Sequence, residues 1–269
     1  LPDPLPVSVI QGSYTPQDLI PAYQARLLED IRLSRPLKVV VDAGNGMAGP
    51  FAPAALEALG CEVIPLYCTL DGRFPHHHPD PTIEANLTDL RAAVLASDAD
   101  IGLGFDGDAD RLGVITNRGD IIWPDRLMMF YVTDILARYP GAPIVFDVKC
   151  SKGLTQHIQQ LGGKPVMSPT GHSLIKAAMK QQASPLAGEM SGHLFFKDRW
   201  YGFDDALYSA CRLLELLSRS PLTVSEQFAL LPCFLSTPEI KIPIAEDKKF
   251  GFMKAFSAAP HFASADRIL

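Results

Sequence analysis

Three carboxylates follow an apolar segment at alternate positions and precede Arg111, within GLGFDGDADRLGVIT: Asp106, Asp108 and Asp110. Anions this close repel one another unless a cation lies among them. Side chains at i, i+2 and i+4 converge only where the backbone curls, and small residues that permit such a curl lie here: Gly104, Gly107 and Ala109. Three oxygen donors suit a hard divalent cation, and Mg²⁺ leaves positions open for a substrate phosphate. The aspartate triplet therefore predicts a magnesium site.

Other interpretations of this triplet are weaker. A calcium-binding EF-hand loop beginning at Asp106 would need glycine and glutamate where Arg111 and Asn117 stand. A solvated turn is disfavoured because apolar segments, IGLGF and LGVIT, lie on both sides. A phosphatase of the haloacid dehalogenase type would need an aspartate two residues after its nucleophile, but Gly44 stands at that spacing from Asp42.

A second polar constellation lies in GEMSGH, where Glu189, Ser191 and His193 alternate and could share one face. A carboxylate, a hydroxyl and an imidazole suit vicinal sugar hydroxyls, because each hydroxyl both donates and accepts. Helix capping after a strand explains the motif alone equally well. The two interpretations therefore stay open at this point.

The segment PTGHS is typical of a helix start whose backbone amides, with Thr170, Gly171 and His172, could receive an anion. Capping by Ser173 explains it as well. Lys149 follows the apolar segment IVFDV and places a cation at the same edge, unless it is an ordinary surface lysine.

Three adjacent histidines, residues 76–78 in DGRFPHHHPDP, do not indicate a zinc site. Neighbouring side chains in an extended segment point to opposite faces, and no cysteine or aspartate spacing completes a ligand set. We expect a connector fixed by its prolines.

The elements that must position these groups alternate regularly. Short β-branched segments are each followed by a helical one, twice over: residues 37–46, 50–60, 61–67, 85–97 and 99–105, then 142–153, 154–163, 164–173, 174–182 and 184–193. The order predicts an α/β fold of tandem β-α-β-α-β units, with mixed, mainly parallel sheets flanked by helices. Ligands gather beyond the carboxyl ends of such strands, where DGDADR and GEMSGH both fall.

Further helices are expected elsewhere. One begins at Thr15 with Pro16 in its first turn. Another spans residues 125–140 with Met128, Val132, Ile135 and Tyr139 on one face. A third spans residues 204–218 and buries Leu207, Ala210, Leu214 and Leu217. A strand (236–244) and a helix (247–256) are expected near the end.

Composition narrows the function classes. The chain of 269 residues is 47% apolar, enough for about two domains. Its 24 basic and 30 acidic residues give a net charge of −6, which argues against a nucleic acid partner. No apolar run reaches membrane-spanning length. Five cysteines without a CxxC motif indicate reduced thiols in a cytoplasmic protein.

Seven segments together carry a resemblance to a known family: DAGNGMAG, GRFPHHHPDP, GFDGDADRLGVI, DVKCS, TGHSLIK, GEMSGHLFF and RWYGFDDALY. In this order they closely resemble the phosphomannomutase/phosphoglucomutase branch of the α-D-phosphohexomutase family. Its four-domain enzymes move a phosphoryl group between C1 and C6 of a hexose phosphate, through a phosphoserine and a bisphosphorylated sugar.

The resemblance implies a role for each candidate residue. Asp106, Asp108 and Asp110 would hold Mg²⁺. Glu189 and Ser191 would contact sugar hydroxyls beside Thr170 and Gly171. Four further side chains would line the substrate cleft as catalytic groups: Arg111, Lys149, His172 and His193.

Two motifs of that family are absent from the 269 residues: the Ser-His-Asn-Pro type loop with the catalytic serine, and the Arg-x-Ser-Asn type phosphate loop. The resemblance thus implies domain II in residues 1–120, domain III in 121–232 and the start of domain IV in 233–269. We expect mannose or glucose 1- or 6-phosphate and the 1,6-bisphosphate as ligands, missing N- and C-terminal domains as partners, and no turnover by this chain alone. The alternative is a non-catalytic module that binds sugar phosphate and Mg²⁺.

Overall fold

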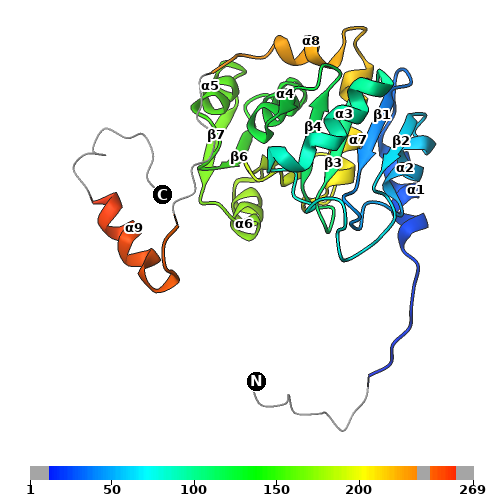
Figure 1. Ribbon diagram of the computed structural model, residues 1–269. Helices are drawn as coiled ribbons and strands as arrows, with labels where there is room; N and C mark the ends of the chain where they lie inside the picture. Colours follow the sequence, from blue (N-terminus) through cyan, green and yellow to red (C-terminus); the bar gives the residue numbers. More distant parts are fainter. Residues whose placement is uncertain (1–11, 235–242, 259–269) are drawn as a thin grey trace.

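The protein contains two β-sheets, and helices pack against both of them (Figure 1). The computed structural model describes residues 12–234 and 243–258. Strand order is β2-β1-β3-β4-β5 in the first sheet and β7-β6-β8-β9 in the second. In each sheet the first three strands in this order run parallel to one another. Each later strand, β4 and β5 in the first sheet and β9 in the second, is antiparallel to the strand before it. The predicted α/β architecture with mixed sheets is confirmed.

The first unit contains the elements α1 (Ile20–Asp30), β1 (Lys38–Asp42), α2 (Ala52–Ala58), β2 (Glu62–Leu66), the 3-10 helix η1 (Glu84–Leu87), α3 (Thr88–Ser97), β3 (Ile101–Phe105), β4 (Leu112–Thr116) and β5 (Ile121–Ile122). The second contains α4 (Pro124–Arg138), β6 (Pro143–Asp147), α5 (Lys152–Gln160), β7 (Lys164–Ser168), α6 (His172–Gln182), β8 (Leu186–Gly188), β9 (Leu194–Phe196), α7 (Ala206–Ser218) and α8 (Val224–Ala229). The 3-10 helix η2 (Glu246–Lys248) and α9 (Lys249–Ser257) come last.

The first sheet buries both of its faces. Val39 and Val41 of β1 belong to the main core with α1 and α2, whereas Val40 packs with α3 on the other face. Gly102 lets α3 lie close to the sheet, since a Cβ there would lie 2.7 Å from Val94 Cγ2. The near-continuous apolar strands follow from this double burial.

The second sheet is covered in the same way. Ile175 and Met179 of α6 pack against one face, while α4 and α5 contribute to the main core on the other. Helix α7 contacts both β4 and β9, so it joins the two sheets in one core. The four residues predicted to be buried on α7 are all buried, which confirms that prediction: Leu207, Ala210, Leu214 and Leu217.

Two predictions about helices are wrong. Helix α1 begins at Ile20 rather than near Thr15, with Pro21 in its first turn. An earlier start would have placed Pro21 in the helix interior, where it removes a hydrogen bond and clashes with the preceding turn. The helix expected over residues 125–140 ends at Arg138, because the backbone of Tyr139 leaves the helical conformation. Tyr139 therefore does not share the helix face of Met128, Val132 and Ile135, and it is 41% exposed.

The end of the chain gives a mixed outcome. The helix expected over residues 247–256 is present as α9. The strand expected over 236–244 falls mostly on residues 235–242, outside the part of the chain that the structure describes. Within the described residues, no helix combines the length and apolar character needed to cross a bilayer.

Candidate functional site

The aspartate triplet lies in the loop between β3 and β4, and the buried Asp106 holds this loop in place through hydrogen bonds. Its carboxylate is 1% exposed. One oxygen, Oδ1, accepts backbone hydrogen bonds from Asp110 and Arg111, both at 3.0 Å, and Oδ2 accepts from Arg111 Nε at 2.6 Å. A buried carboxylate bonded in this way fixes the loop to its own strand ends.

The backbone curl differs from the expectation in its cause. Ala109 takes the left-handed conformation, with φ 66°, while Gly107 does not. Gly104 lies within β3, and a Cβ there would stand 3.1 Å from Leu87 Cδ2. Gly104 therefore serves helix packing, and the curl itself depends on Ala109.

The structure brings the three carboxylates together. One oxygen from each of Asp106, Asp108 and Asp110 lies within 4.8 Å of the others, with Asp106 buried, Asp110 half-buried and Asp108 exposed. An all-oxygen set that opens toward solvent fits a hard cation such as Mg²⁺, which keeps several waters or substrate oxygens.

Burial and the crowding of the three carboxylates shift the pKa of Asp110. Burial, together with the charges of Asp106 and Asp108, raises the pKa of Asp110 to about 6, although the neighbouring His193 opposes the shift. A bound cation relieves such repulsion. Perturbed carboxylates of this kind gather at functional sites.

Arg111 lies between two carboxylates. Besides the bond from Nε to Asp106, its Nη1 donates to Asp80 Oδ1 at 3.1 Å. Asp80 belongs to the proline-rich segment 72–81 and also accepts hydrogen bonds from Thr82. That segment therefore supports the loop of the triplet from behind. The sequence offered no role for Asp80.

The histidines of the same segment have separate partners. His77 Nε2 lies 3.0 Å from Asp42 Oδ2, and His76 Nδ1 lies 2.7 Å from Asn45 Oδ1. The His76 ring also stacks on Tyr67, with centroids 3.8 Å apart. These contacts tie the segment to the end of β1, as a connector requires.

The GEMSGH segment forms the hairpin between β8 and β9, and Glu189 holds it to the start of α6. Glu189 is 2% exposed. Its Oε1 accepts the backbone N–H of Gly171 at 2.6 Å, and its Oε2 accepts Ser191 Oγ at 3.3 Å. Thr170 is held in parallel, because its hydroxyl donates to Asp147 Oδ2 at 2.9 Å. Lys149 is exposed beyond the end of β6.

The two loops meet across the boundary between the sheets. The backbone N–H of Leu112 donates to Gly192 O at 3.2 Å, and Arg111 and His193 form an isolated antiparallel bridge. His193 Nδ1 lies 3.5 Å from Asp110 Oδ1 and 3.3 Å from Asp204 Oδ2. Burial alone would lower the pKa of His193, but these carboxylates raise it.

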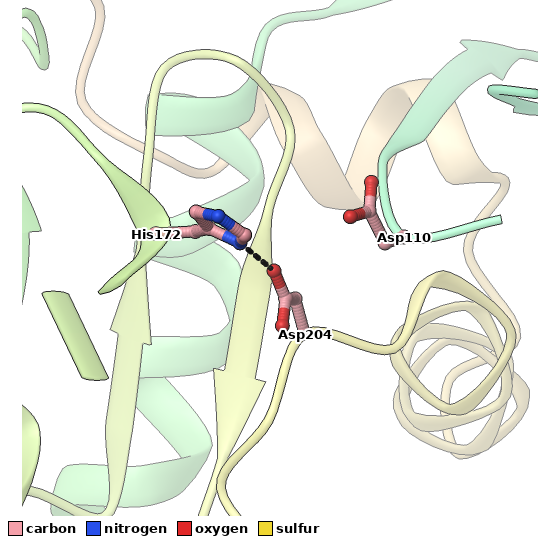
Figure 2. Close-up of side chains that lie close together, drawn as sticks. All are labelled: Asp110, His172 and Asp204. Carbon is pink, nitrogen blue, oxygen red and sulfur yellow. Dashed lines mark hydrogen bonds and ion pairs between the residues drawn. The ribbon is translucent and has the colours of Figure 1, made fainter. Parts of the chain in front are cut away.

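Asp204 is a residue that sequence reasoning missed. It lies just before α7, and its Oδ2 is 3.0 Å from His172 Nδ1 (Figure 2). Its Oδ1 accepts a hydrogen bond from Lys176 Nζ at 3.0 Å. Its polar partners hold the pKa of Asp204 well below the ordinary value, although burial opposes the shift. The only signal was its place in RWYGFDDALY.

Comparisons with known proteins identify the family of the chain. Residues 21–119 match the model of phosphoglucomutase/phosphomannomutase alpha/beta/alpha domain II, and residues 123–234 match that of domain III. A phosphomannomutase/phosphoglucomutase from Pseudomonas aeruginosa is 55% identical over 244 residues, which are 91% of this chain and 53% of that protein. A phosphoglucomutase from Neisseria gonorrhoeae is 48% identical over 260 residues, covering 96% and 56%.

Solved structures give the same result. The crystal structure of a phosphoglucomutase/phosphomannomutase family protein from Burkholderia thailandensis superimposes with a TM-score of 0.89 at 49% identity, over 96% of this chain and 55% of that one. The chain thus spans about half the length of the curated relatives it matches. With two consecutive domain models matched over most of its length, the chain belongs to the phosphoglucomutase/phosphomannomutase family.

Proposed function

We propose that the chain is the central part of a magnesium-dependent hexose phosphomutase, which interconverts the 6-phosphate and 1-phosphate of mannose or glucose through a phosphoserine and a bisphosphorylated sugar. The observation that supports this most is the 3.5 Å approach of His193 Nδ1 to Asp110 Oδ1, because it sets the metal loop and the sugar loop against each other. The names of the relatives support the same reaction.

The first part of the proposal concerns charge. Asp106, Asp108 and Asp110 would hold Mg²⁺, which would neutralise negative charge on the transferring phosphoryl group. Arg111 supplies a fixed guanidinium at the base of the loop, oriented by Asp80 and Asp106. Lys149 lies beyond the carboxyl end of β6 and would add positive potential for the phosphate.

The second part concerns the sugar. Glu189 and Ser191 would pair with sugar hydroxyls at the mouth of the hairpin, where each hydroxyl needs a donor and an acceptor. Thr170 and Gly171 would line the same ligand from the start of α6. His172 and His193 would face it from the side of Asp204, which orients both rings.

The arrangement of domains is also proposed. Residues 1–120 would form domain II, 121–232 domain III, and 233–269 the start of domain IV, while the phosphoserine would come from another domain of the longer protein. The cysteine pattern of the sequence, five cysteines without a CxxC motif, supports a reducing, cytoplasmic location as part of the same proposal.

The test is to graft residues 21–234 in place of the matching segment of the Pseudomonas aeruginosa relative. A coupled assay then measures conversion of glucose 1-phosphate and mannose 1-phosphate. We expect turnover that Asp108→Asn abolishes. A folded graft that binds hexose phosphates without converting them would instead support the non-catalytic module.

A further inference from the structure

We propose a second cation site beside the aspartate triplet, formed by Asp110, His172 and Asp204 and selective for a transition metal such as Zn²⁺. One ligand atom from each of these residues lies within 4.8 Å of the other two. Figure 2 shows the carboxylate of Asp110 on the side that faces the His172 and Asp204 pair. Three convergent protein ligands with an open position are what a zinc site needs.

The donor set separates this site from the triplet. The triplet offers only carboxylate oxygens, which suit Mg²⁺, whereas His172 adds an imidazole nitrogen, which suits Zn²⁺, Co²⁺ or Ni²⁺. His172 is half-exposed, so a cation reaches it from solvent.

A second imidazole lies beside the same two carboxylates. The Nδ1 atom of His193 is buried. It lies 3.5 Å from Asp110 Oδ1 and 3.3 Å from Asp204 Oδ2, beside the same two ligands. A cation held by those carboxylates would have a second imidazole at hand.

Hydrogen-bond partners fix the orientation of the Asp204 carboxylate. Lys176 Nζ holds Oδ1 at 3.0 Å, whereas Oδ2 lies 3.0 Å from His172 Nδ1 and so faces the site. Lys176 thus fixes the orientation of the Asp204 carboxylate and leaves its second oxygen toward the site.

Two consequences follow from the position of the site. Asp110 comes from the loop after β3, whereas His172 begins α6 and Asp204 precedes α7, so a bound Zn²⁺ would join the two units. Asp110 belongs to both cation sites, so Zn²⁺ and Mg²⁺ would compete. The zinc site itself does not depend on the mutase activity proposed above.

The experiment titrates Zn²⁺ alone into the 269-residue chain by calorimetry, in wild type, His172→Ala, Asp204→Asn and Asp108→Asn. Asp108→Asn is the matched control, because Asp108 belongs to the triplet only. We expect both His172→Ala and Asp204→Asn to weaken Zn²⁺ binding by more than about tenfold, and Asp108→Asn to leave it unchanged.

A second readout identifies the ligand directly. In ¹⁵N NMR spectra of wild type, Zn²⁺ should shift a ring nitrogen of His172 and leave that of His157 in place. Zinc binding that survives His172→Ala and Asp204→Asn but is lost in Asp108→Asn would place the cation in the triplet and overturn the proposal. Absence of any Zn²⁺ binding would overturn it too, while the mutase assay of the graft would be unaffected by either result.

Discussion

The backbone N–H of Gly171 donates a hydrogen bond of 2.6 Å to Glu189 Oε1, and this bond joins the start of α6 to the β8–β9 hairpin. A residue proposed to contact the sugar thus also holds two loops in register. Its carboxylate is almost fully buried. Ser191 shares the proposed sugar contact, but its hydroxyl donates to the Glu189 carboxylate and does not join the two loops.

Replacing Glu189 with alanine should therefore destabilise the fold, whereas Ser191→Ala should not. Loss of the buried acceptor leaves Gly171 N–H without its partner, at a cost of about 1–3 kcal/mol in the free energy of unfolding. Ser191→Ala should change it by less than about 0.5 kcal/mol. Urea unfolding of both variants measures the difference, and equal stabilities would show that the Glu189 bond contributes nothing.

Arg111→Lys should be destabilising despite the retained charge. The guanidinium reaches Asp106 and Asp80 at once from two different nitrogens, a geometry that one ammonium cannot reproduce. We expect a loss of about 2 kcal/mol, typical of a hydrogen bond to a charged group. Arg73→Lys is the matched control, because Arg73 is largely exposed and pairs only locally with Asp71. Denaturant unfolding measures the loss of unfolding free energy in both variants. Equal losses in Arg111→Lys and Arg73→Lys would show that the two-carboxylate geometry of Arg111 does not contribute to stability.

The sequence predicted the loops better than it predicted how they meet. Apolar periodicity located β3, β8 and their polar ends, since each unit encodes its own alternation of strands and helices. The contact between His193 and Asp204, by contrast, depends on how α7 packs between two sheets, and no local pattern encodes that packing. Asp204 lies in an irregular segment without periodicity, so sequence reasoning assigned it no role although it stands in one of the segments that carry the family resemblance.

His77 should make stability depend on pH. Its hydrogen bond to Asp42 raises the pKa of His77 against the opposing effect of burial. Such a histidine contributes stability that is fully present below its unfolded pKa of about 6.5 and is lost as pH rises through the higher folded value. His77→Gln should therefore cost more stability at about pH 5.5 than at about pH 9.

Unfolding measured at both pH values tests this prediction. His78→Gln is the control, because His78 is exposed beside His77. A His77→Gln cost that is the same at both pH values would mean that the pair with Asp42 does not depend on the charge of His77.

Magnesium should stabilise the folded chain through the triplet. A ligand that binds only the folded state raises the free energy of unfolding by RT ln(1 + [L]/Kd), or about 2.7 kcal/mol at 100 times Kd. Asp108→Asn should abolish this gain and leave the metal-free protein intact, since Asp108 is exposed while Asp106 supports the loop. Thermal unfolding of wild type and Asp108→Asn, each with Mg²⁺ and with EDTA, measures the effect. If Mg²⁺ still stabilises Asp108→Asn, Asp108 is not a ligand of the cation.

Gly113→Ala should destabilise the fold next to the proline-rich segment 72–81 that supports the site. Gly113 lies in β4, and a Cβ there would stand 2.6 Å from Pro81 Cβ, whose ring cannot move aside like a flexible chain end. Overpacking of this kind costs about 1–3 kcal/mol. Gly72→Ala is the control, because a Cβ there meets nothing within 4 Å.

The same substitution tests how Asp80 is positioned. Pro81 follows Asp80, so its displacement should pull that carboxylate away from Arg111, whose Nη1 lies 3.1 Å from Asp80 Oδ1. Gly113→Ala and Asp80→Asn should then be non-additive, with a coupling of about 0.5 kcal/mol or more in a double-mutant cycle of unfolding free energies. Strict additivity would mean that the proline-rich segment yields to the new methyl group without moving Asp80. The support of Arg111 would then be independent of the packing on β4.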